Sequence, residues 1–236
     1  MRHLDWDGCF NVRDLGGLRA VDGRATRWGA VVRGDSPDRL TAAGWSALRG
    51  HGIRTIIDLR NEDERHLDRE RPAGLTTVLL PLDGREDARF WDRWARGPQF
   101  ATPLYYRPHL DRFPERSARV VAAIAGAEPG GVLVHCVGGR DRTGQIAMLL
   151  LALLGMPPQA IARDYALSRE RLTVRYAALG EEDQGPTLAD YLSGHGTTAE
   201  GAILSTLAEV DVQECLRAGG LRDADIASLR DRVLEP

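Results

Sequence analysis

The chain has 236 residues, of which 43% are hydrophobic, and a formal net charge of −3. This length and apolar content fit one domain, residues 1–236, with a substantial buried core. The slightly acidic balance argues against general nucleic-acid binding. A net negative charge still allows a local basic funnel around Arg140 and Arg142. The longest apolar run, Ile146 to Leu154, is too short to cross a bilayer, so we expect no stable membrane association.

The N-terminal third of the chain is predicted to alternate helices with strands. Thr41 and Asn61 are each placed to cap the start of a helix, and the acidic residues that follow Asn61 suit a first helical turn. The expected elements are a helix from Thr41 through Arg49, a strand from Ile53 to Leu59, a helix from Asn61 that ends at Pro72, and a strand from Thr77 to Leu80.

Two polar segments, near residues 83–112 and 179–198, have patterns that leave their role open. The first carries Trp91 and Trp94 without helical periodicity, so it is either a lid over a site or a loop that its tryptophans pin to the core. The second is rich in Gly, Asp and Glu, so it is either a mobile flap or a plain surface connection.

The second half of the chain is predicted to add one central strand and most of the helices. Apolar residues recur at helical spacing after Pro114, and a Gly-rich turn then leads into the short apolar run Val132 to Val134. Further helices are expected over 146–154, 160–172, 198–210 and 223–233. The fold class is therefore α/β, with a largely parallel sheet flanked by helices on both faces and a site at the carboxyl ends of its strands.

The most informative segment is residues 135–144, His-Cys-Val-Gly-Gly-Arg-Asp-Arg-Thr-Gly, which lies between the strand at 132–134 and the helix at 146–154. A strand that enters a tight glycine-containing loop and then a helix presents free backbone N–H groups to an anion. Cys136 precedes Arg142 by six residues, and this span brings the guanidinium back over the sulfur. A thiol in such a field favours its thiolate form, which is the nucleophile.

The rest of the loop is predicted to bind phosphate. Gly138 and Gly139 permit a concave turn of N–H groups, in which Val137 and Arg140 also take part. The planar fork of Arg142 matches two phosphoryl oxygens. The hydroxyl of Thr143 is placed to hydrogen-bond the thiolate and to ease its departure from phosphorus.

Two aspartates are candidates for the general acid that protonates the leaving oxygen. Asp141 lies inside the loop, and Asp83 follows the strand predicted at Thr77 to Leu80, at the same edge of the sheet. We favour Asp141. The alternative role for Asp141 is structural, with its carboxylate accepting backbone N–H groups and stiffening the loop.

Several basic residues are predicted near this edge of the sheet. Arg13 beside Asp14, and Arg33 near Asp35, either support the phosphate pocket from behind or form structural ion pairs or turn caps. Arg60 follows a predicted strand and has the same two possible roles.

The histidines point to no cofactor. His135 ends the central strand and is expected to orient the loop. The others that we considered, His51, His66, His109 and His195, lack the mutual spacing of a metal site and are expected at the surface. Phosphocysteine chemistry needs no metal, so we predict no cofactor.

This loop resembles that of the cysteine-dependent protein tyrosine phosphatases, whose signature is His-Cys, five residues, Arg and then Ser or Thr. The likeness is to the bacterial branch that includes a secreted mycobacterial tyrosine phosphatase, and it covers nearly the whole chain. Other similar segments are Asn11 to Gly17, Arg33 to Thr41, Gly52 to Arg60, Asp164-Tyr165 and Leu216 to Gly220. The resemblance implies a phosphatase-like fold in which Cys136 is the nucleophile and Arg142 binds phosphate.

Two loop positions bear on the substrate. The branch commonly has lysine at the position of Arg140, where a basic residue has been linked to phosphoinositide use, but this chain contains no lysine at all. In its aspartate at position 141, the loop also resembles the loops of myotubularin-like lipid phosphatases. In those enzymes the aspartate at this position is credited as the general acid. The resemblance therefore favours Asp141 and keeps lipid substrates open.

We therefore predict a phosphomonoester hydrolase that acts as a protein tyrosine phosphatase, with dual-specificity or phosphoinositide activity also open. The alternatives are a phosphatase of a small metabolite and a phosphate-binding module without turnover. The first residues lack the apolar core of a signal peptide, and one of three cysteines must stay reduced, so a cytoplasmic location is expected, with signal-less export left open. The sequence indicates no oligomeric state.

Overall fold

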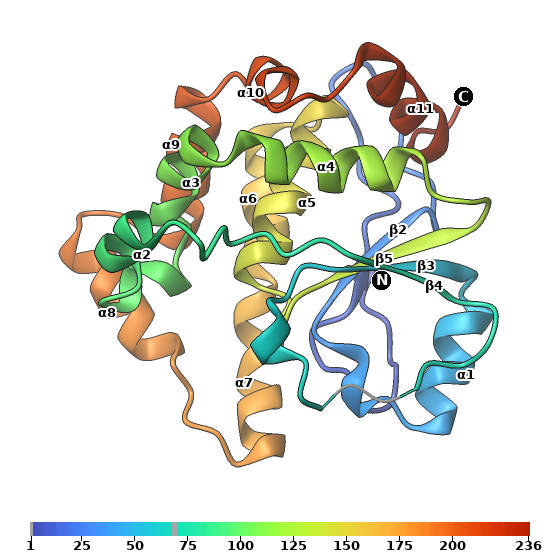
Figure 1. Ribbon diagram of the computed structural model, residues 1–236, viewed down its shortest axis with the longest axis horizontal. Coiled ribbons are helices and arrows are strands. Elements are labelled where there is room, and N and C mark those ends of the chain that lie inside the picture. Colours follow the sequence, from blue (N-terminus) through green and yellow to red (C-terminus); the bar gives the residue numbers. More distant parts are fainter. Residues whose placement is uncertain (1, 68–69) are drawn as a thin grey trace.

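A five-stranded sheet forms the centre of the protein in the computed structural model, which describes residues 2–67 and 70–236 (Figure 1). The strand order is β1-β2-β5-β3-β4. Strands β2, β5, β3 and β4 run parallel, and β1 pairs antiparallel with β2 at one edge. The strands are β1 (Arg13–Asp14), β2 (Val31–Gly34), β3 (Ile53–Asp58), β4 (Thr76–Leu79) and β5 (Gly131–His135). This confirms the predicted α/β class with a largely parallel sheet.

The sheet is covered on both faces because its central strands alternate apolar residues between two cores. Val31 and Ile57 belong to the larger core, whereas Val32, Ile56 and Leu133 belong to the smaller one. The smaller core lies under α1 (Ala42–Gly50), whose N-terminus is capped by the Thr41 side chain as predicted. The larger core is formed with α4 (Pro114–Ala125) and α5 (Asp141–Leu153).

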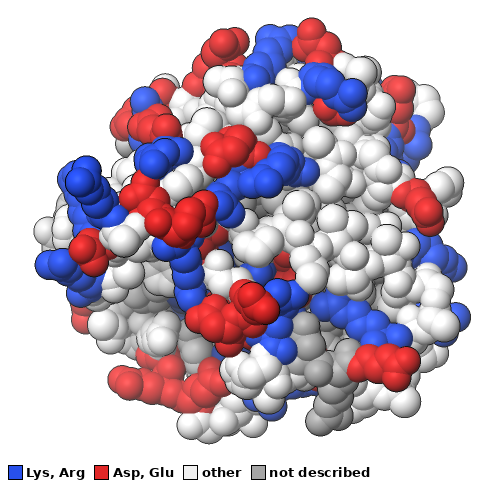
Figure 2. Space-filling model, viewed as in Figure 1, with Lys and Arg blue, Asp and Glu red and all other residues white. Residues whose placement is uncertain are grey.

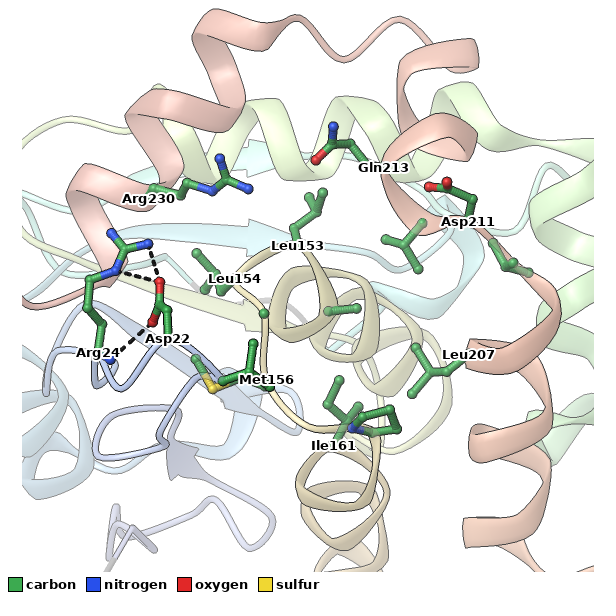
Figure 3. A pocket seen from close by; sticks show the side chains of 16 residues that line it. Asp22, Arg24, Leu153, Leu154, Met156, Ile161, Leu207, Asp211, Gln213 and Arg230 are labelled. Carbon is green, nitrogen blue, oxygen red and sulfur yellow. Dashed lines mark hydrogen bonds and ion pairs between the residues drawn. The ribbon is translucent and has the colours of Figure 1, made fainter.

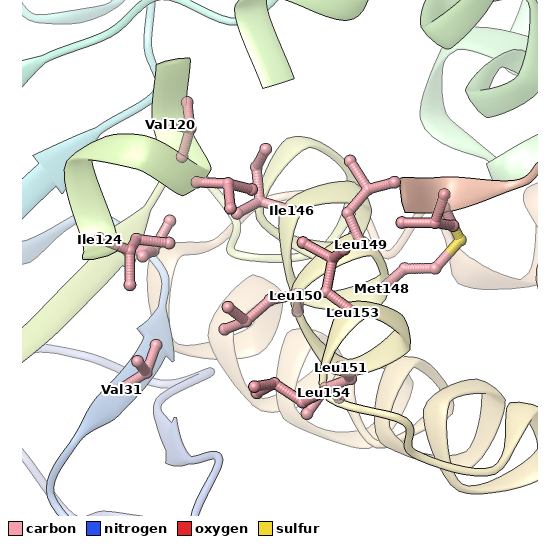
Figure 4. Packing of buried hydrophobic residues seen from close by; sticks show 14 of the residues in the cluster. Val31, Val120, Ile124, Ile146, Met148, Leu149, Leu150, Leu151, Leu153 and Leu154 are labelled. Carbon is pink, nitrogen blue, oxygen red and sulfur yellow. The ribbon is translucent and has the colours of Figure 1, made fainter. Parts of the chain in front are cut away.

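Helix α5 lies at the centre of the larger core. Nearly all of its residues are buried, so it carries apolar side chains on every side rather than on one stripe. Figure 4 shows Ile146 and Leu150 on the side of α5 that faces Ile124 of α4 and Val31 of β2. Since α5 begins at the loop that follows β5, this packing fixes the loop against the sheet.

The remaining helices extend the structure beyond the sheet. In Figure 1, α2, α3, α8 and α9 lie together on the side of α5 and α6 that faces away from the strands. Helices α10 and α11 pack against α4. The bounds are α2 (Ala88–Trp94), α3 (Tyr106–Arg112), α6 (Pro158–Ala166), α7 (Ser168–Leu179), α8 (Gly185–Gly194), α9 (Ala199–Glu209), α10 (Val212–Ala218) and α11 (Asp223–Val233).

Two of the expected helices are wrong in extent, and two helices were not expected. After Asn61 there is one 3-10 turn, Glu62–Glu64, because the Glu64 side chain turns back to accept from the Asn61 N–H and closes the turn. The helix expected over 160–172 is interrupted at Leu167 and forms α6 and α7. The segment 179–198 contains α8, and α10 was not expected. Residues 68–69, within the helix expected after Asn61, lie outside the described residues.

The aromatic side chains of the segment near residues 83–112 pack against one another. The Trp91 indole donates to the Asp83 carbonyl (2.9 Å), and its ring meets the edge of Phe100 at 5.2 Å between centroids. Phe90 packs edge-on against Phe113 at 5.1 Å. These contacts lie within the segment or at its border, and its residues Tyr105, Tyr106 and Leu110 belong to the larger core.

Charged side chains of both signs are interspersed on the face shown in Figure 2. Several of them form ion pairs across neighbouring elements, such as Arg112 with Asp87 at 2.5 Å. Within residues 2–67 and 70–236, no helix has both the length and the apolar character that crossing a bilayer requires.

Candidate active site

The loop of residues 136–142 leaves the end of β5 and enters α5. Cys136 and Arg142 are both largely buried there, with 3% and 7% of their surfaces exposed. Burial alone would lower the pKa of Arg142, but its hydrogen bonds to Glu64 and its electrostatic interactions with Asp83 and Cys136 raise that pKa well above its usual value. The guanidinium therefore lies within electrostatic reach of the thiol.

Three successive carbonyl groups of the loop point outward to fixed donors. The Val137 carbonyl accepts from the Ser36 N–H (3.0 Å), and the Gly138 carbonyl accepts from the Asn11 side-chain amide (2.9 Å). The Gly139 carbonyl accepts from Arg33 (2.8 Å). Among the described residues, none accepts a hydrogen bond from the N–H groups of residues 137–140. A peptide unit held by its carbonyl presents its N–H on the opposite side, so these groups form a set of donors for an anion.

Gly139 makes this loop geometry possible. Its φ is +68°, a conformation that residues with a side chain rarely adopt, and a Cβ there would lie 2.5 Å from backbone atoms of Gly34. At Gly138 a Cβ would meet only the Leu172 side chain, at an ordinary 3.5 Å. The close approach to β2 therefore requires glycine at one of the two predicted positions.

Arg142 is held in place by a carboxylate that the sequence had not connected with it. Glu64 accepts from both terminal nitrogens of Arg142, at 2.5 and 2.6 Å, in a fork-to-fork pair. Burial would raise the pKa of Glu64, but the hydrogen bonds and charge of Arg142 lower it to about 2. In the sequence, Glu64 is only one of the acidic residues after Asn61 that suit a first helical turn, and its 78-residue separation from Arg142 leaves no local signal of this contact.

The two candidate acids occupy different environments. Asp141 accepts from the Tyr165 hydroxyl and from Arg140 Nε, both at about 3.1 Å, and its side chain is 22% exposed. Asp83 is 1% exposed and accepts from the Asn61 amide (2.6 Å) and from Arg142 (3.3 Å). Burial raises the pKa of Asp83, and the charge of Arg142 opposes this rise. The first carboxyl group reaches solvent, whereas the second is packed behind the guanidinium.

Several buried polar atoms around the loop have no hydrogen-bond partner within the described part of the chain. They are Oδ1 of Asp83, the hydroxyl of Tyr105 and Oγ1 of Thr143. Such atoms are rare in folded proteins unless a ligand or water completes them. Their position around Cys136 and Arg142 fits a site that receives a polar ligand.

No ion pair of the described residues joins Arg13 to Asp14 or Arg33 to Asp35. Both arginines instead donate to the buried carboxylate of Asp164, from 3.1 Å and 2.8 Å. Asp35 accepts from the Phe10 and Asn11 N–H groups, and Asp14 accepts from those of Gly16 and Gly29. The geometry therefore brings Arg13 and Arg33 behind the loop, through a partner whose role the sequence had not suggested.

Arg60 and His135 support the strand ends that flank the loop. Arg60 donates to Asp58 (2.8 Å) and Asp38 (2.5 Å), and it borders a cavity of about 430 Å³ that reaches the loop at Val137. His135 is fully buried, and its Nδ1 lies 3.1 Å from the Cys136 carbonyl, to which it can only donate. Burial lowers the pKa of His135 to about 4.

The expectation that the other histidines lie at the surface is wrong for His109. This residue is fully buried, with Nε2 3.0 Å from the Leu82 carbonyl and Nδ1 3.0 Å from the Gln145 amide of α5. Its imidazole packs among the rings of Phe90, Trp91, Tyr105 and Phe113. Among residues 2–67 and 70–236, no group of three or more His, Cys, Asp or Glu side chains is arranged to hold a metal ion.

Two cavities lie at opposite ends of α5. One of about 350 Å³ adjoins the loop at Arg140 and α6 at Tyr165, and Ala166, Leu188 and Leu192 form much of its apolar wall. The other, of about 420 Å³, lies at the C-terminal end of α5 (Figure 3). It is lined by Leu153, Leu154, Met156, Ile161 and Leu207, with Asp22, Arg24, Asp211, Gln213 and Arg230 around them.

Comparison with known proteins identifies a family that the chain matches along nearly its whole length. Residues 4–235 match the model of a family described as the tyrosine phosphatase family. A tyrosine-protein phosphatase of Nostoc commune is 29% identical over 220 residues, covering 86% of this chain and 74% of that protein. The triple specificity protein phosphatase PtpB of Mycobacterium tuberculosis is 28% identical over 204 residues, covering 74% and 72%.

Two further matches are more partial or more distant. A candidate tyrosine-protein phosphatase of Cupriavidus necator is 31% identical over 177 residues, which cover 72% of this chain but only 64% of that protein. The crystal structure of TpbA from P. aeruginosa aligns over 84% of this chain and 90% of its own, with 18% identity and a TM-score of 0.42.

Proposed function

The chain belongs to the tyrosine phosphatase family, and we propose that it hydrolyses phosphomonoesters, phosphotyrosine foremost, through a covalent phosphocysteine on Cys136. The observation that carries this proposal is the set of unpaired N–H groups of residues 137–140, which adjoins both Cys136 and Arg142. An anion bound by these donors lies against a potential nucleophile and a fixed cation. A phosphoryl group is the anion that this arrangement can also transfer.

The first step transfers the phosphoryl group to sulfur. The Cys136 thiolate attacks phosphorus as the bond from phosphorus to the leaving oxygen breaks, and Asp141 gives its proton to that oxygen. Arg142 and the loop N–H groups bind the equatorial oxygens, where charge is spread in the transition state. The solvent-exposed edge of Asp141 supports its role as the acid, since Asp83 faces Arg142 instead.

The second step returns the enzyme to its starting state. Water attacks phosphorus, the phosphorus–sulfur bond breaks, and the Asp141 carboxylate takes the proton that the water loses. Thr143 lies at the start of α5 with an unpartnered hydroxyl, which we assign to the departing thiolate as a hydrogen-bond donor. Inorganic phosphate then leaves.

The cavity beside Arg140 and Tyr165 favours an aromatic leaving group. Both residues contact Asp141, so the cavity lies on the side where the leaving oxygen would be protonated. Its largely apolar wall suits a phenyl ring better than an inositol ring with several further phosphates. Phosphoinositides and small phosphorylated metabolites are the second candidates, because Arg140 and Arg169 also border the cavity.

Hydrolysis of p-nitrophenyl phosphate tests the proposed reaction. We expect activity that needs no added metal, is inhibited by vanadate and falls by at least about 10⁴-fold in Cys136→Ser, as for removal of a covalent nucleophile. Cys215→Ser is the matched control, because this half-buried thiol on α10 lies away from the loop and its loss should leave activity unchanged. Full activity in Cys136→Ser would remove the proposed nucleophile.

The acid is identified by pH profiles on a substrate with a poor leaving group. We expect Asp141→Asn to lose the basic limb of the profile, whereas Asp83→Asn keeps it and is slowed at every pH. If only Asp83→Asn loses the limb, the acid is Asp83. A panel of phosphotyrosine peptides, inositol phosphates and nucleoside phosphates then ranks the substrate classes.

A further inference from the structure

Behind the phosphate loop lies a buried charge cluster that the proposed reaction does not use directly. Asp164, on α6, is 1% exposed and accepts hydrogen bonds from Arg2 (2.7 Å), Arg13 (3.1 Å) and Arg33 (2.8 Å). Burial would raise the pKa of Asp164, but the charges of Arg13 and Arg33 hold it well below its usual value. The carboxylate is therefore ionised and organises three guanidinium groups.

Two of these guanidinium groups connect Asp164 to the loop. Arg33 donates from one terminal nitrogen to Asp164 and from the other to the carbonyls of Gly139 (2.8 Å) and Arg140 (3.4 Å). Arg13 donates to the Asn11 side-chain oxygen (2.9 Å), which leaves the Asn11 amide to donate to the Gly138 carbonyl (2.9 Å). One carboxylate thus fixes, through two routes, the carbonyls of three successive loop residues.

The cluster also carries an excess of positive charge. Arg13 and Arg33 are nearly as buried as Asp164, so two guanidinium groups share one carboxylate in the interior. An uncompensated buried charge is costly. Here the carbonyl oxygens of the loop, which are the negative ends of the peptide dipoles, partly compensate the second guanidinium charge. Each carbonyl that turns toward Arg33 or Asn11 directs the N–H of the same peptide unit away from them. The N–H groups so directed are those of residues 139, 140 and 141.

We propose that Asp164 is a positioning residue of the phosphate site, which clamps the loop carbonyls through Arg13 and Arg33 and thereby turns the loop N–H groups toward the bound oxyanion. The inference rests on the proposed function of that loop. It predicts that Asp164 governs oxyanion affinity and thiol reactivity, although its side chain touches neither the substrate nor Cys136.

The test compares Asp164→Asn with Asp14→Asn. Asp14 is an equally buried aspartate that accepts from Gly16, Gly29 and His51, away from the loop, so the same chemical change there controls for lost stability. The readouts are the inhibition constants of inorganic phosphate and vanadate, the pH at which iodoacetamide alkylates Cys136 at half its maximal rate, and thermal unfolding.

In Asp164→Asn we expect phosphate to bind roughly ten to a hundred times more weakly, as for displaced oxyanion donors, and the alkylation midpoint to move to higher pH. In Asp14→Asn both should stay at the wild-type value. Wild-type affinity and midpoint in Asp164→Asn would overturn the inference. So would equal losses in both variants, because they would assign the effect to general destabilisation.

A milder variant keeps the inference testable if Asp164→Asn does not fold. Asn11→Ala releases the Gly138 carbonyl and removes one acceptor of Arg13, but it leaves the ion pairs of Asp164 in place. We therefore expect a smaller loss of phosphate affinity in the same direction. Unchanged affinity there contradicts the clamp. A wild-type protein that neither binds phosphate nor hydrolyses p-nitrophenyl phosphate would instead refute the proposed function itself.

Discussion

The two ends of α5 both border a cavity, yet they differ in what surrounds it. At the N-terminal end, the cavity adjoins Arg140, which belongs to the loop whose N–H groups have no partner among the described residues and which leads to Arg142. At the C-terminal end, the cavity of Figure 3 has an apolar floor, and its charged rim includes Asp22 and Arg24 bonded to each other. None of the unpartnered buried atoms in the described residues lies on that lining. Of these two cavities, the N-terminal one therefore adjoins the loop that carries Cys136 and its unpaired donors, and the C-terminal one adjoins no such group among the described residues.

Of the substitutions that test this difference between the two ends of α5, the largest loss of activity is expected at Arg142. Arg142→Lys keeps the charge but loses the planar fork that meets both Glu64 oxygens. We expect kcat/KM for p-nitrophenyl phosphate to fall by about 10²–10³, the cost of losing a transition-state donor. Steady-state kinetics measure this, with circular dichroism as the check on folding. A loss below tenfold would mean that the N-terminal end does not depend on the fork.

The next effect concerns pH and stability at the loop end. The pKa of His135 is lowered by burial to about 4, whereas an unfolded histidine has a pKa near 6.5. The unfolded chain therefore binds more protons between these values, so the stability contribution is complete above about pH 6.5 and is lost as the pH falls toward 4. Between pH 6.5 and 4, we therefore expect His135→Asn to lose about 3 kcal/mol less free energy of unfolding than the wild type.

Urea unfolding of both proteins at several pH values from neutral to 4 measures the difference. His109, whose pKa is also lowered to about 4 by burial, leaves a residual slope in the variant. Parallel stability curves for wild type and His135→Asn would show that this imidazole is not held neutral.

A smaller effect is expected at Glu64. Glu64→Gln keeps an acceptor for Arg142 but removes the charge. We expect kcat/KM to fall by about tenfold, which corresponds to the low end of the free energies of charge-assisted hydrogen bonds. Because the pKa of Glu64 is about 2, the loss should be the same throughout the acidic and neutral range. A loss that appears only at high pH would instead give Glu64 a role in proton transfer.

The smallest effect should come from the far end of α5. Arg230 is exposed on the rim of the cavity in Figure 3. We expect Arg230→Ala to change stability by less than about 0.5 kcal/mol and kcat/KM by less than about twofold. A larger change in activity, measured beside Arg142→Lys, would show that the two ends of α5 communicate.

The sequence was most informative where function is contiguous. Cys136, the loop glycines and Arg142 lie within seven residues between a strand and a helix, so their spacing alone predicted a shared volume. The partners that hold them come from far along the chain: Glu64 is 78 residues from Arg142, and Asp164 is 131 residues from Arg33. With 31 arginines and 34 acids, no local pattern selects these pairs.

The fold followed the same rule. Strands and capped helices with strong local periodicity were predicted within one or two residues, as at Thr41 and at Ile53 to Leu59. The misjudged segments are those that tertiary contacts decide. The turn at 62–64 closes because Glu64 binds both Asn61 and Arg142, and the break at Leu167 precedes Ser168, whose hydroxyl accepts from Arg13.

Gly139 offers a criterion for sorting related proteins by sequence alone. Since any side chain there would collide with the backbone of β2, a homologue that keeps the cysteine and the arginine but carries even alanine at this position has no way to close the same loop. Such chains would be expected among inactive paralogues, which retain the motif's reactive residues and still fail to turn over substrate.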